Sequence, residues 1–194
     1  VFLTACSSNP NVIEPSPLPE LEPQYQVKRL WKKNAGTGIG DARLRLQPAV
    51  TGRAVYAADI DGRVTAFARE KGKRLWRRDT DYRISGGVAV AYGQVLFGTR
   101  DGEVVALSAE TGERLWQTRV NSEVLASPVT DGEQVVVQTL DGHVVSLNAA
   151  DGSERWNFHL SVPVLTLRGT STPVISGNRV LAGFASGKVV SLRA

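Results

Sequence analysis

Short apolar stretches alternate with turn residues along most of the chain, and the apolar positions recur with the two-residue period of half-buried strands. Between residues 126 and 159 this pattern predicts four strands, at about Ala126–Thr130, Gln134–Thr139, His143–Asn148 and Glu154–His159. An Asp-Gly pair separates each strand from the next. Because glycine tolerates the positive φ of a tight turn, Asp-Gly between apolar runs predicts a hairpin. The stretch therefore predicts an antiparallel four-stranded sheet, and no segment has a helical pattern.

This unit recurs along the chain, as VYAADIDGRVTAFAREKGKRLW, VLFGTRDGEVVALSAETGERLW, VVVQTLDGHVVSLNAADGSERW and the shorter VLAGFASGKVVSLRA. The tryptophans at 31, 76, 116 and 156 are spaced by 45, 40 and 40 residues. Four antiparallel strands every forty or so residues are typical of β-propeller blades. A β-sandwich is the rival all-β fold, but a sandwich has no reason to repeat its turns and tryptophans in register. We expect each tryptophan to bury its large ring between neighbouring blades.

The repeats fall at about 44–78, 85–119, 125–160 and 170–194, so residues 27–194 are predicted to be a partial β-propeller of about four blades. Residues Lys28–Lys33, KRLWKK, have the pattern of a lone outermost strand, and the fourth unit lacks its own. Two arrangements are then open. The lone strand and the fourth unit complete one shared blade of a four-bladed ring, which removes exposed sheet edges. Alternatively, the chain is the first half of a larger ring.

The first residues, VFLTAC, end an apolar run in small residues followed by Cys6, the only cysteine of the chain. Leu-Thr-Ala-Cys resembles a bacterial lipobox, in which the cysteine thiol receives a diacylglycerol and its amine is acylated. Residues 1–5 are thus predicted to be the remnant of a lipoprotein signal peptide. Residues 6–26 hold five of the nine prolines, which favours an extended tether behind a lipidated Cys6. The resemblance to a lipobox also implies, from Ser7 after the cysteine, sorting to the outer membrane.

The charge and the residue types of the chain bear on nucleic-acid binding, metal binding and catalysis. The 23 basic and 19 acidic residues leave an excess of four, with the densest basic cluster in RLWRRDTDYR at residues 74–83. No stacking aromatics are interleaved with these arginines in the way nucleic-acid surfaces require, so no nucleic-acid partner is expected. His143 and His159 have no carboxylate cluster near them in sequence, and no G-x-S-x-G elbow occurs. We expect no catalytic residue, no metal and no cofactor.

Two connections between units are about five residues longer than the others. They are NAGTGIGDARLRLQ and the stretch from Asn157 to Thr172. Strand alternation puts both on one rim with the turns between second and third strands; we call this the loop rim. Leu165 and Leu167 beside Arg168 have the composition of an interface centre. From the residues alone, the leucines could equally fold back onto the core. Arg43, Leu44, Arg45 and Leu46 in the first long loop are weaker candidates.

The repeat DGxVxALxAxTGxxxW is similar to the PQQ-type propeller repeat of quinoprotein dehydrogenases. Together with the lipobox, the proline-rich tether and the loop PVLTLRGTSTPVI, the whole chain resembles the N-terminal half of the BamB family. That family comprises lipoprotein subunits of the β-barrel assembly machinery in the Gram-negative outer membrane. The resemblance implies an eight-bladed ring, of which about four blades are present. It also implies a lipid-anchored location on the periplasmic face of the outer membrane.

The same resemblance implies the partners. Leu165, Leu167 and Arg168 match the family loop that contacts BamA, the barrel subunit, with the leucines filling an apolar groove and the guanidinium pairing with a carboxylate or carbonyls. The other implied partners are further subunits of the machinery and precursors of outer-membrane proteins. The implied function is that of a non-enzymatic scaffold that assists the folding and insertion of these precursors.

Two other functions compete with the scaffold. A PQQ-dependent oxidoreductase needs a quinone seat with calcium ligands and often a vicinal cysteine pair, whereas this chain has one cysteine. DIDG at residues 59–62 resembles the start of a calcium loop, but the downstream ligands do not follow, and a tight hairpin explains it better. A generic ligand-binding or adhesion propeller is the third possibility, if the match of the LTLRG loop is chance.

Overall fold

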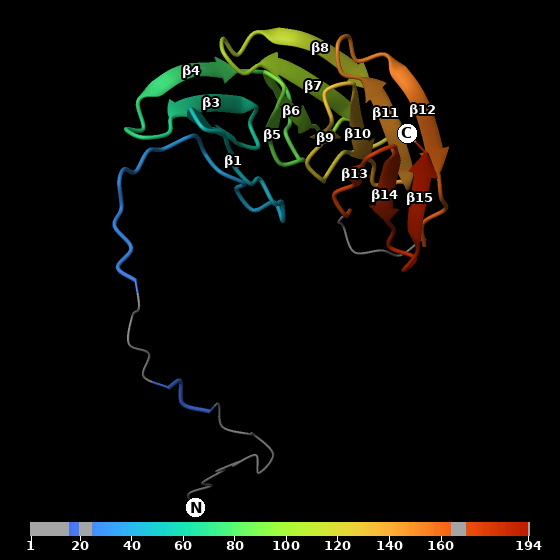
Figure 1. Ribbon diagram of the computed structural model, residues 1–194. Coiled ribbons are helices and arrows are strands. Elements are labelled where there is room, and N and C mark those ends of the chain that lie inside the picture. The colour runs from blue at the N-terminus through green and yellow to red at the C-terminus, as the bar shows by residue number, and fades with distance from the viewer. Residues whose placement is uncertain (1–15, 20–24, 164–169, 194) are drawn as a thin grey trace, which may run out of the picture.

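Four antiparallel sheets follow one another along the chain and are arranged as the blades of an arc (Figure 1). The computed structural model describes residues 16–19, 25–163 and 170–193. Within these ranges every helix or strand assigned is a strand. No helix in the described part of the chain is long and apolar enough to pass through a membrane. The all-β propeller architecture predicted from the repeats is confirmed.

Each sheet is built from strands that are consecutive in sequence, in the order of the chain. Blade 1 contains β1 (Ala49–Val50), β2 (Ala54–Ala58), β3 (Arg63–Ala68) and β4 (Arg74–Asp79). Blade 2 contains β5 (Ala89–Ala91), β6 (Gln94–Gly98), β7 (Glu103–Ser108) and β8 (Arg114–Arg119). Blade 3 contains β9 (Val129–Thr130), β10 (Gln134–Gln138), β11 (His143–Asn148) and β12 (Glu154–His159). Blade 4 contains β13 (Val174–Ser176), β14 (Arg179–Gly183) and β15 (Val189–Arg193).

The strands predicted in blade 3 are present, and β11 and β12 have the predicted bounds. The first strand is shorter than predicted, because β9 covers only Val129–Thr130 instead of Ala126–Thr130. Pro128 explains the difference, since it has no N–H to donate to a strand ladder. Upstream of it, a single bridge between Val124 and Thr139 continues the pairing.

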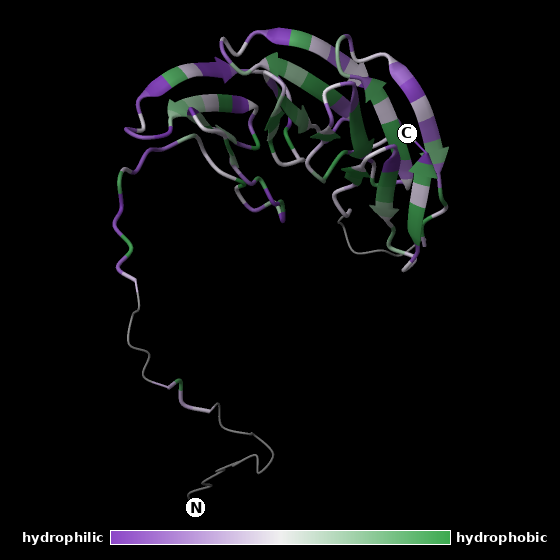
Figure 2. Cartoon of the chain, in the orientation of Figure 1, coloured by the Kyte–Doolittle hydropathy of each residue, from purple (hydrophilic) through white to green (hydrophobic). Residues whose placement is uncertain are grey.

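The hydrophobic core lies between the blades. One buried cluster joins blades 1 and 2 through residues such as Tyr56 and Phe97, and a second joins blades 2 and 3 through Leu96 and Val137. A third cluster joins blades 3 and 4. The apolar colouring is accordingly concentrated in the middle strands, whereas the outer strands β4, β8 and β12 are banded (Figure 2). Blades 2 and 3, which have a blade on each side, therefore bury both faces of their middle strands, whereas in blade 4 Leu181 and Val189 are 37% and 76% exposed.

At the outer edge, a tryptophan connects blade 1 to blade 2 and another connects blade 2 to blade 3. Trp156 of blade 3 packs against the core cluster between blades 3 and 4, but its Nε1 has no hydrogen-bond partner among the described residues. The indole Nε1 of Trp76 on β4 donates a hydrogen bond to the carbonyl of Ala109 in blade 2, at 3.0 Å. Trp116 on β8 donates in the same way to Ala149 in blade 3, at 2.9 Å. In each case the ring lies on a turn glycine of the next blade, and a Cβ built on Gly112 would come within 2.7 Å of the Trp76 ring. We call this arrangement the tryptophan lock, and it confirms the predicted packing of Trp76 and Trp116 between blades.

The prediction of a strand at Lys28–Lys33 is wrong, since no strand is formed there. The segment also lies beside β3 and β4 in Figure 1, far from β15, so the described residues do not close a four-bladed ring. Trp31 nevertheless makes a tryptophan lock, because its Nε1 donates to the carbonyl of Arg69 at 2.7 Å and its ring lies on Gly72. The spacing of the tryptophans therefore predicted the contact of Trp31 correctly, although the residues around it form no strand. Its neighbours have no third strand of a preceding blade to pair with among the described residues.

The tryptophan lock predicts a specific sensitivity at Gly112. Gly112 and Gly93 both have a positive φ, of 73° and 77°, so alanine at either position should lower the free energy of unfolding by about 1–2 kcal/mol. Gly93 has nothing within 4 Å of its built Cβ, whereas Gly112 faces the Trp76 ring. Urea denaturation of Gly112→Ala should therefore show a further loss of about 1–3 kcal/mol from overpacking. Equal losses in the two variants would contradict the lock.

A second stability prediction concerns Thr65 in β3. Its Oγ1 is buried without a hydrogen-bond partner among the described residues, and the matching positions in blades 2 and 3 are Val105 and Val145. Replacing an unsatisfied buried hydroxyl by a methyl group of the same shape removes a desolvation cost. Thr65→Val should raise the free energy of unfolding by about 1 kcal/mol in the same assay. Thr99→Val is the control and should lower it, because Thr99 Oγ1 accepts the Glu103 N–H at 2.9 Å.

Candidate functional site

The loop rim is built where the connections between blades cross the turns between second and third strands. The N–H of Thr80 donates to the carbonyl of Gly62 at 3.1 Å, and the N–H of Val120 donates to Gly102 at 2.7 Å. Leu160 repeats the contact with Gly142, at 3.0 Å. The prediction that these two sets of loops share one rim is therefore confirmed, and the same backbone contact fixes each connection to a turn.

A side-chain acceptor organises each of these turns. Thr99 Oγ1 accepts the N–H of Glu103 at 2.9 Å, and Thr139 Oγ1 accepts the N–H of His143 at 3.1 Å. In blade 1 the same position holds Asp59, whose Oδ1 accepts the N–H of Arg63 at 2.8 Å. The hairpin that was predicted for DIDG is thus present. The carboxylate also brings a second oxygen that a threonine does not have.

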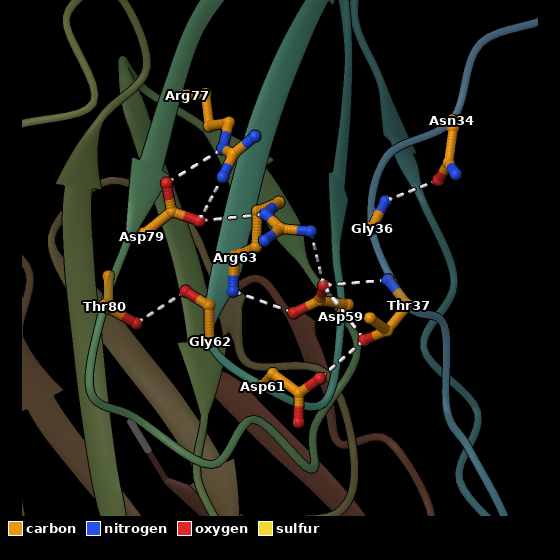
Figure 3. Close-up of polar contacts among 10 residues, drawn as sticks. All are labelled: Asn34, Gly36, Thr37, Asp59, Asp61, Gly62, Arg63, Arg77, Asp79 and Thr80. Carbon is orange, nitrogen blue, oxygen red and sulfur yellow. Dashed lines mark hydrogen bonds and ion pairs between the residues drawn. The ribbon is translucent and has the colours of Figure 1, made fainter.

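That second oxygen holds the first long loop (Figure 3). Asp59 Oδ2 accepts the N–H of Thr37 at 3.0 Å and the Thr37 hydroxyl at 3.3 Å, and the hydroxyl also lies 2.7 Å from an oxygen of Asp61. Asp59 is only 1% exposed, so its carboxylate is shielded from water, whereas Thr37 lies on the exposed side of the contact. The Arg63 guanidinium, 3.7 Å away, supplies the compensating charge. We call this contact between Asp59 and Thr37 the loop latch.

Exposed ion pairs continue from the loop latch along the outer strand. Asp79 accepts hydrogen bonds from the guanidinium groups of Arg77 and Arg63, both at 2.8 Å. The hydrogen bond from Arg77 and then that from Arg63 hold the pKa of Asp79 below its usual value. In blade 2, Arg83 pairs with Asp101 and lowers the pKa of that carboxyl in the same way. These pairs stay ionised across the neutral range but are exposed, so they orient side chains more than they stabilise the fold.

The second long loop is anchored at both of its described ends. On the entering side, Val162 packs against Gly142, where a Cβ would come within 2.9 Å of the valine. On the leaving side, the Ser171 hydroxyl is 2.7 Å from the carbonyl of Gly183 and 3.2 Å from Gln138 Oε1. These ends flank a cavity of about 350 Å³ between blades 3 and 4. Residues 164–169 lie outside the described residues, so the described ends locate only where this stretch leaves and rejoins the rim.

The predicted site residues divide into two groups. Leu165, Leu167 and Arg168 fall within residues 164–169, and Cys6 falls within residues 1–15, so all four lie outside the described residues. The weaker candidates in the first long loop are described. Arg43 and Arg45 are exposed, whereas Leu44 and Leu46 are half-buried, and Leu46 packs against the core between blades 1 and 2. Leu46 therefore has a packing role, whereas the two arginine side chains lie on the surface.

The two histidines lie side by side on β11 and β12, with ring centroids 4.5 Å apart. His143 Nδ1 is 2.7 Å from Asn157 Oδ1, and its Nε2 is 3.8 Å from Asp141. Among the described residues, no group of three or more histidine, cysteine, aspartate or glutamate side chains is placed to hold a metal ion. The loop latch, by contrast, was not predicted. The signal available was Asp59 at a position where the other repeats have Thr99 and Thr139.

The fold and the repeated turns define a β-propeller protein of the PQQ-like class, with its loops gathered on one rim. A family model described as "Outer membrane protein assembly factor BamB" matches residues 60–194. The chain belongs to the BamB family. The proteins of that name from Pseudomonas aeruginosa and Kangiella koreensis are 62% and 49% identical to it over 191 residues, which is 98% of this chain. The chain spans about half the length of these two relatives, 50% and 49% respectively.

Solved structures agree with this assignment. The crystal structure of BamB from Moraxella catarrhalis matches with a TM-score of 0.71 and 29% identity, over 76% of this chain and 45% of that one. The designed protein Ika4 matches with a TM-score of 0.66 over 80% of this chain and 95% of its own. A europium-containing methanol dehydrogenase matches with a TM-score of 0.52 over 62% of this chain and 26% of its own. At 17% and 20% identity, the last two likenesses concern the fold alone.

The loop latch predicts a variant that loosens the first long loop without unfolding the blade. Asp59→Thr keeps an acceptor for the Arg63 N–H, as Thr99 does in blade 2, but loses the bonds to Thr37. We expect limited trypsin digestion after Arg43 and Arg45 to become about tenfold faster, since local opening governs cleavage there. The urea midpoint should change little. Asp59→Ala is the control: it should also speed cleavage, and it should lower the urea midpoint as well, because it leaves the Arg63 N–H without its acceptor. An unchanged cleavage rate in Asp59→Thr would contradict the latch.

Proposed function

We propose that this chain is part of a non-enzymatic scaffold that assists the folding and insertion of outer-membrane proteins within the β-barrel assembly machinery. It is anchored to the periplasmic face of the outer membrane by lipid on Cys6, and residues 6–26 form the tether behind the signal remnant 1–5. Through Leu165, Leu167 and Arg168, the loop rim binds the periplasmic domains of BamA. Other subunits and the barrel precursors meet the same scaffold.

The observation that carries this proposal is the match of residues 60–194 to a family named for outer-membrane protein assembly. The loop rim supports the choice of surface. Both long loops leave the blades there, and each is fixed by side-chain contacts, through Asp59 in one case and Ser171 in the other. Loops held at their ends on a rigid sheet lose less conformational entropy on binding, which is why binding residues gather at such sites.

No contact among the described residues of the loop rim favours the oxidoreductase. The Asp59 carboxylate, which begins the calcium-like sequence DIDG, is already engaged by Thr37 and Arg63. The relatives that cover nearly all of this chain carry the name of an assembly factor. The likeness to a methanol dehydrogenase, at 20% identity, concerns the fold alone.

The proposed partner contact is tested with a triple variant, Leu165→Ala, Leu167→Ala and Arg168→Ala. We expect its dissociation constant for the periplasmic region of BamA, measured by pull-down and then by calorimetry, to rise at least about tenfold. Central apolar and arginine contacts dominate such interfaces, and losing one commonly costs about 2 kcal/mol or more.

The matched control replaces two leucines and an arginine elsewhere on the surface, with Leu75→Ala, Leu115→Ala and Arg119→Ala. Leu75 and Leu115 are 52% and 51% exposed on the outer strands of blades 1 and 2. The control should bind BamA as the parent chain does, with both variants keeping the parent's melting temperature. Undiminished binding by the first triple variant, or equal losses in both, would end the assignment.

A further inference from the structure

The positive charge of the chain is concentrated in one part of it. Residues 27–83 contain 15 basic and 6 acidic residues, whereas residues 84–194 contain 8 basic and 10 acidic ones. Blade 1 and the segment that leads into it thus hold the whole basic excess, although all the blades share one architecture. A charge difference between equivalent blades is not required by the fold, and it indicates a partner of opposite charge.

The turns between the third and fourth strands of blades 1, 2 and 3 differ in charge. In blade 1 this turn reads REKGKR at residues 69–74, whereas it reads AETGER at 109–114 and AADGSE at 149–154. All three form the same hairpin around a glycine with a positive φ. At the positions of Arg69, Lys71 and Lys73, blades 2 and 3 have alanine, threonine, aspartate, glutamate and serine. Because those blades form the same hairpin, these three cations of blade 1 have no structural task that the hairpin needs.

A second basic segment is fixed beside this hairpin by a tryptophan lock. Trp31 donates to the carbonyl of Arg69, and its ring lies 6.2 Å from that of Phe67, measured between centroids. This contact places KRLWKK against the hairpin. Lys33 then lines one cavity of about 650 Å³ together with Lys73, Arg74 and Arg77. Cations that are forty residues apart in sequence therefore converge on one surface.

We call this surface the basic edge, and its exposed members are Lys28, Arg29, Lys32, Lys33, Arg69, Lys71, Lys73, Arg74, Arg77 and Arg78. Glu70 is the one exposed carboxylate within the two stretches, 28–33 and 69–78, that supply these members. Arg77 pairs with Asp79, and Arg78 donates to main-chain carbonyls of blade 2. The side chains of Lys32, Lys33, Lys73 and Arg74 make no ion pair or hydrogen bond within residues 16–19, 25–163 and 170–193. Their charges are available to a ligand.

We propose that the basic edge docks on an anionic membrane surface by binding the phosphates of phospholipid headgroups. Clustered lysines and arginines near a lipid bilayer bind anionic headgroups in this way, by electrostatic attraction within a Debye length. The proposal goes beyond the assembly function and does not require the lipid on Cys6, because it concerns the folded blades. Docking through the basic edge would fix the orientation of blade 1, and with it that of the loop rim, relative to the bilayer.

Apolar residues among the cations favour a membrane over an acidic protein. Tyr25, Val27 and Leu30 are 86%, 98% and 79% exposed within the segment that precedes the hairpin, and Leu75 is 52% exposed on β4. Aromatic and aliphatic side chains mixed with lysine and arginine are the composition of a membrane-interface segment, in which the apolar groups enter the headgroup region. The segment also follows directly on the proposed tether, so a lipid anchor would bring this surface to the bilayer.

The test uses the chain with Cys6→Ser, so that no acyl chain contributes and failure of the proposed anchor has no influence. It is mixed with vesicles of phosphatidylethanolamine that contain or lack phosphatidylglycerol, and the bound fraction is measured by co-sedimentation. We expect binding only to the vesicles with phosphatidylglycerol, weakening steeply as salt is added. Equal binding to both kinds of vesicle would overturn the proposal.

The decisive variant gives blade 1 the hairpin residues of blade 2, with Arg69→Ala, Lys71→Thr and Lys73→Glu. At about fivefold per cation, vesicle affinity should fall roughly a hundredfold. The variant lowers the net charge by four. The control lowers it by four at two exposed positions outside the basic edge, with Arg100→Glu and Lys188→Glu, and should keep most of the affinity.

Equal losses in both variants would mean attraction by net charge alone. If inorganic phosphate, added at the concentration of lipid phosphate, displaced the protein from the vesicles, the basic edge would be a site for a small anion. Either result rejects the basic edge as a membrane-docking surface.

Discussion

The tryptophan lock is the contact on which the arrangement of blades depends. A four-stranded sheet alone leaves both faces of its middle strands in water, and the apolar clusters form only when one sheet stacks on the next. The lock sets that stacking at the outer edge, where a hydrogen bond from Trp76 or Trp116 to the next blade accompanies burial of a large ring. The turn glycine is part of the same contact, because any side chain there would meet the ring.

A repeated contact of this kind leaves the rest of each blade open to variation. Blade 1 differs from blades 2 and 3 at two such places. At the loop rim, Asp59 stands where blades 2 and 3 have threonine, and it holds a long loop. At the hairpin, Arg69, Lys71 and Lys73 replace the neutral and acidic residues of blades 2 and 3. Neither change alters the strands. The features that distinguish blade 1 from blades 2 and 3 are thus surface side chains on strands that are the same in all three blades.

Much of the fold could be predicted because the same local signals occur several times. Asp-Gly turns and apolar alternation located β11 and β12 to the residue, and the forty-residue spacing of tryptophans indicated contacts between blades. The predictions failed where tertiary context decides. Lys28–Lys33 has the pattern of a strand but no neighbouring strand to pair with, and Pro128 shortened β9.

The candidate site was predictable in outline only. Strand alternation placed both long loops on one rim, since that inference needs the topology and no side-chain geometry. Asp59 departs from the threonine of blades 2 and 3, but its partner Thr37 could not be predicted, because the two residues are 22 positions apart and meet only after blade 1 has formed. The convergence of Lys33 with Lys73 likewise depends on where Trp31 binds. Long-range polar contacts leave no periodic trace in a sequence, whereas repeated apolar contacts do.

Hydrogen exchange of the indole N–H groups, followed by NMR, tests the tryptophan lock most directly. The lock predicts that the Nε1 protons of Trp76 and Trp116 exchange as slowly as the backbone amides of the central strands, because both are released only when blades separate. Exchange of these two protons at the rate of an exposed tryptophan, while the strand amides stay protected, would contradict it. The blades would then be stacked by their apolar clusters alone.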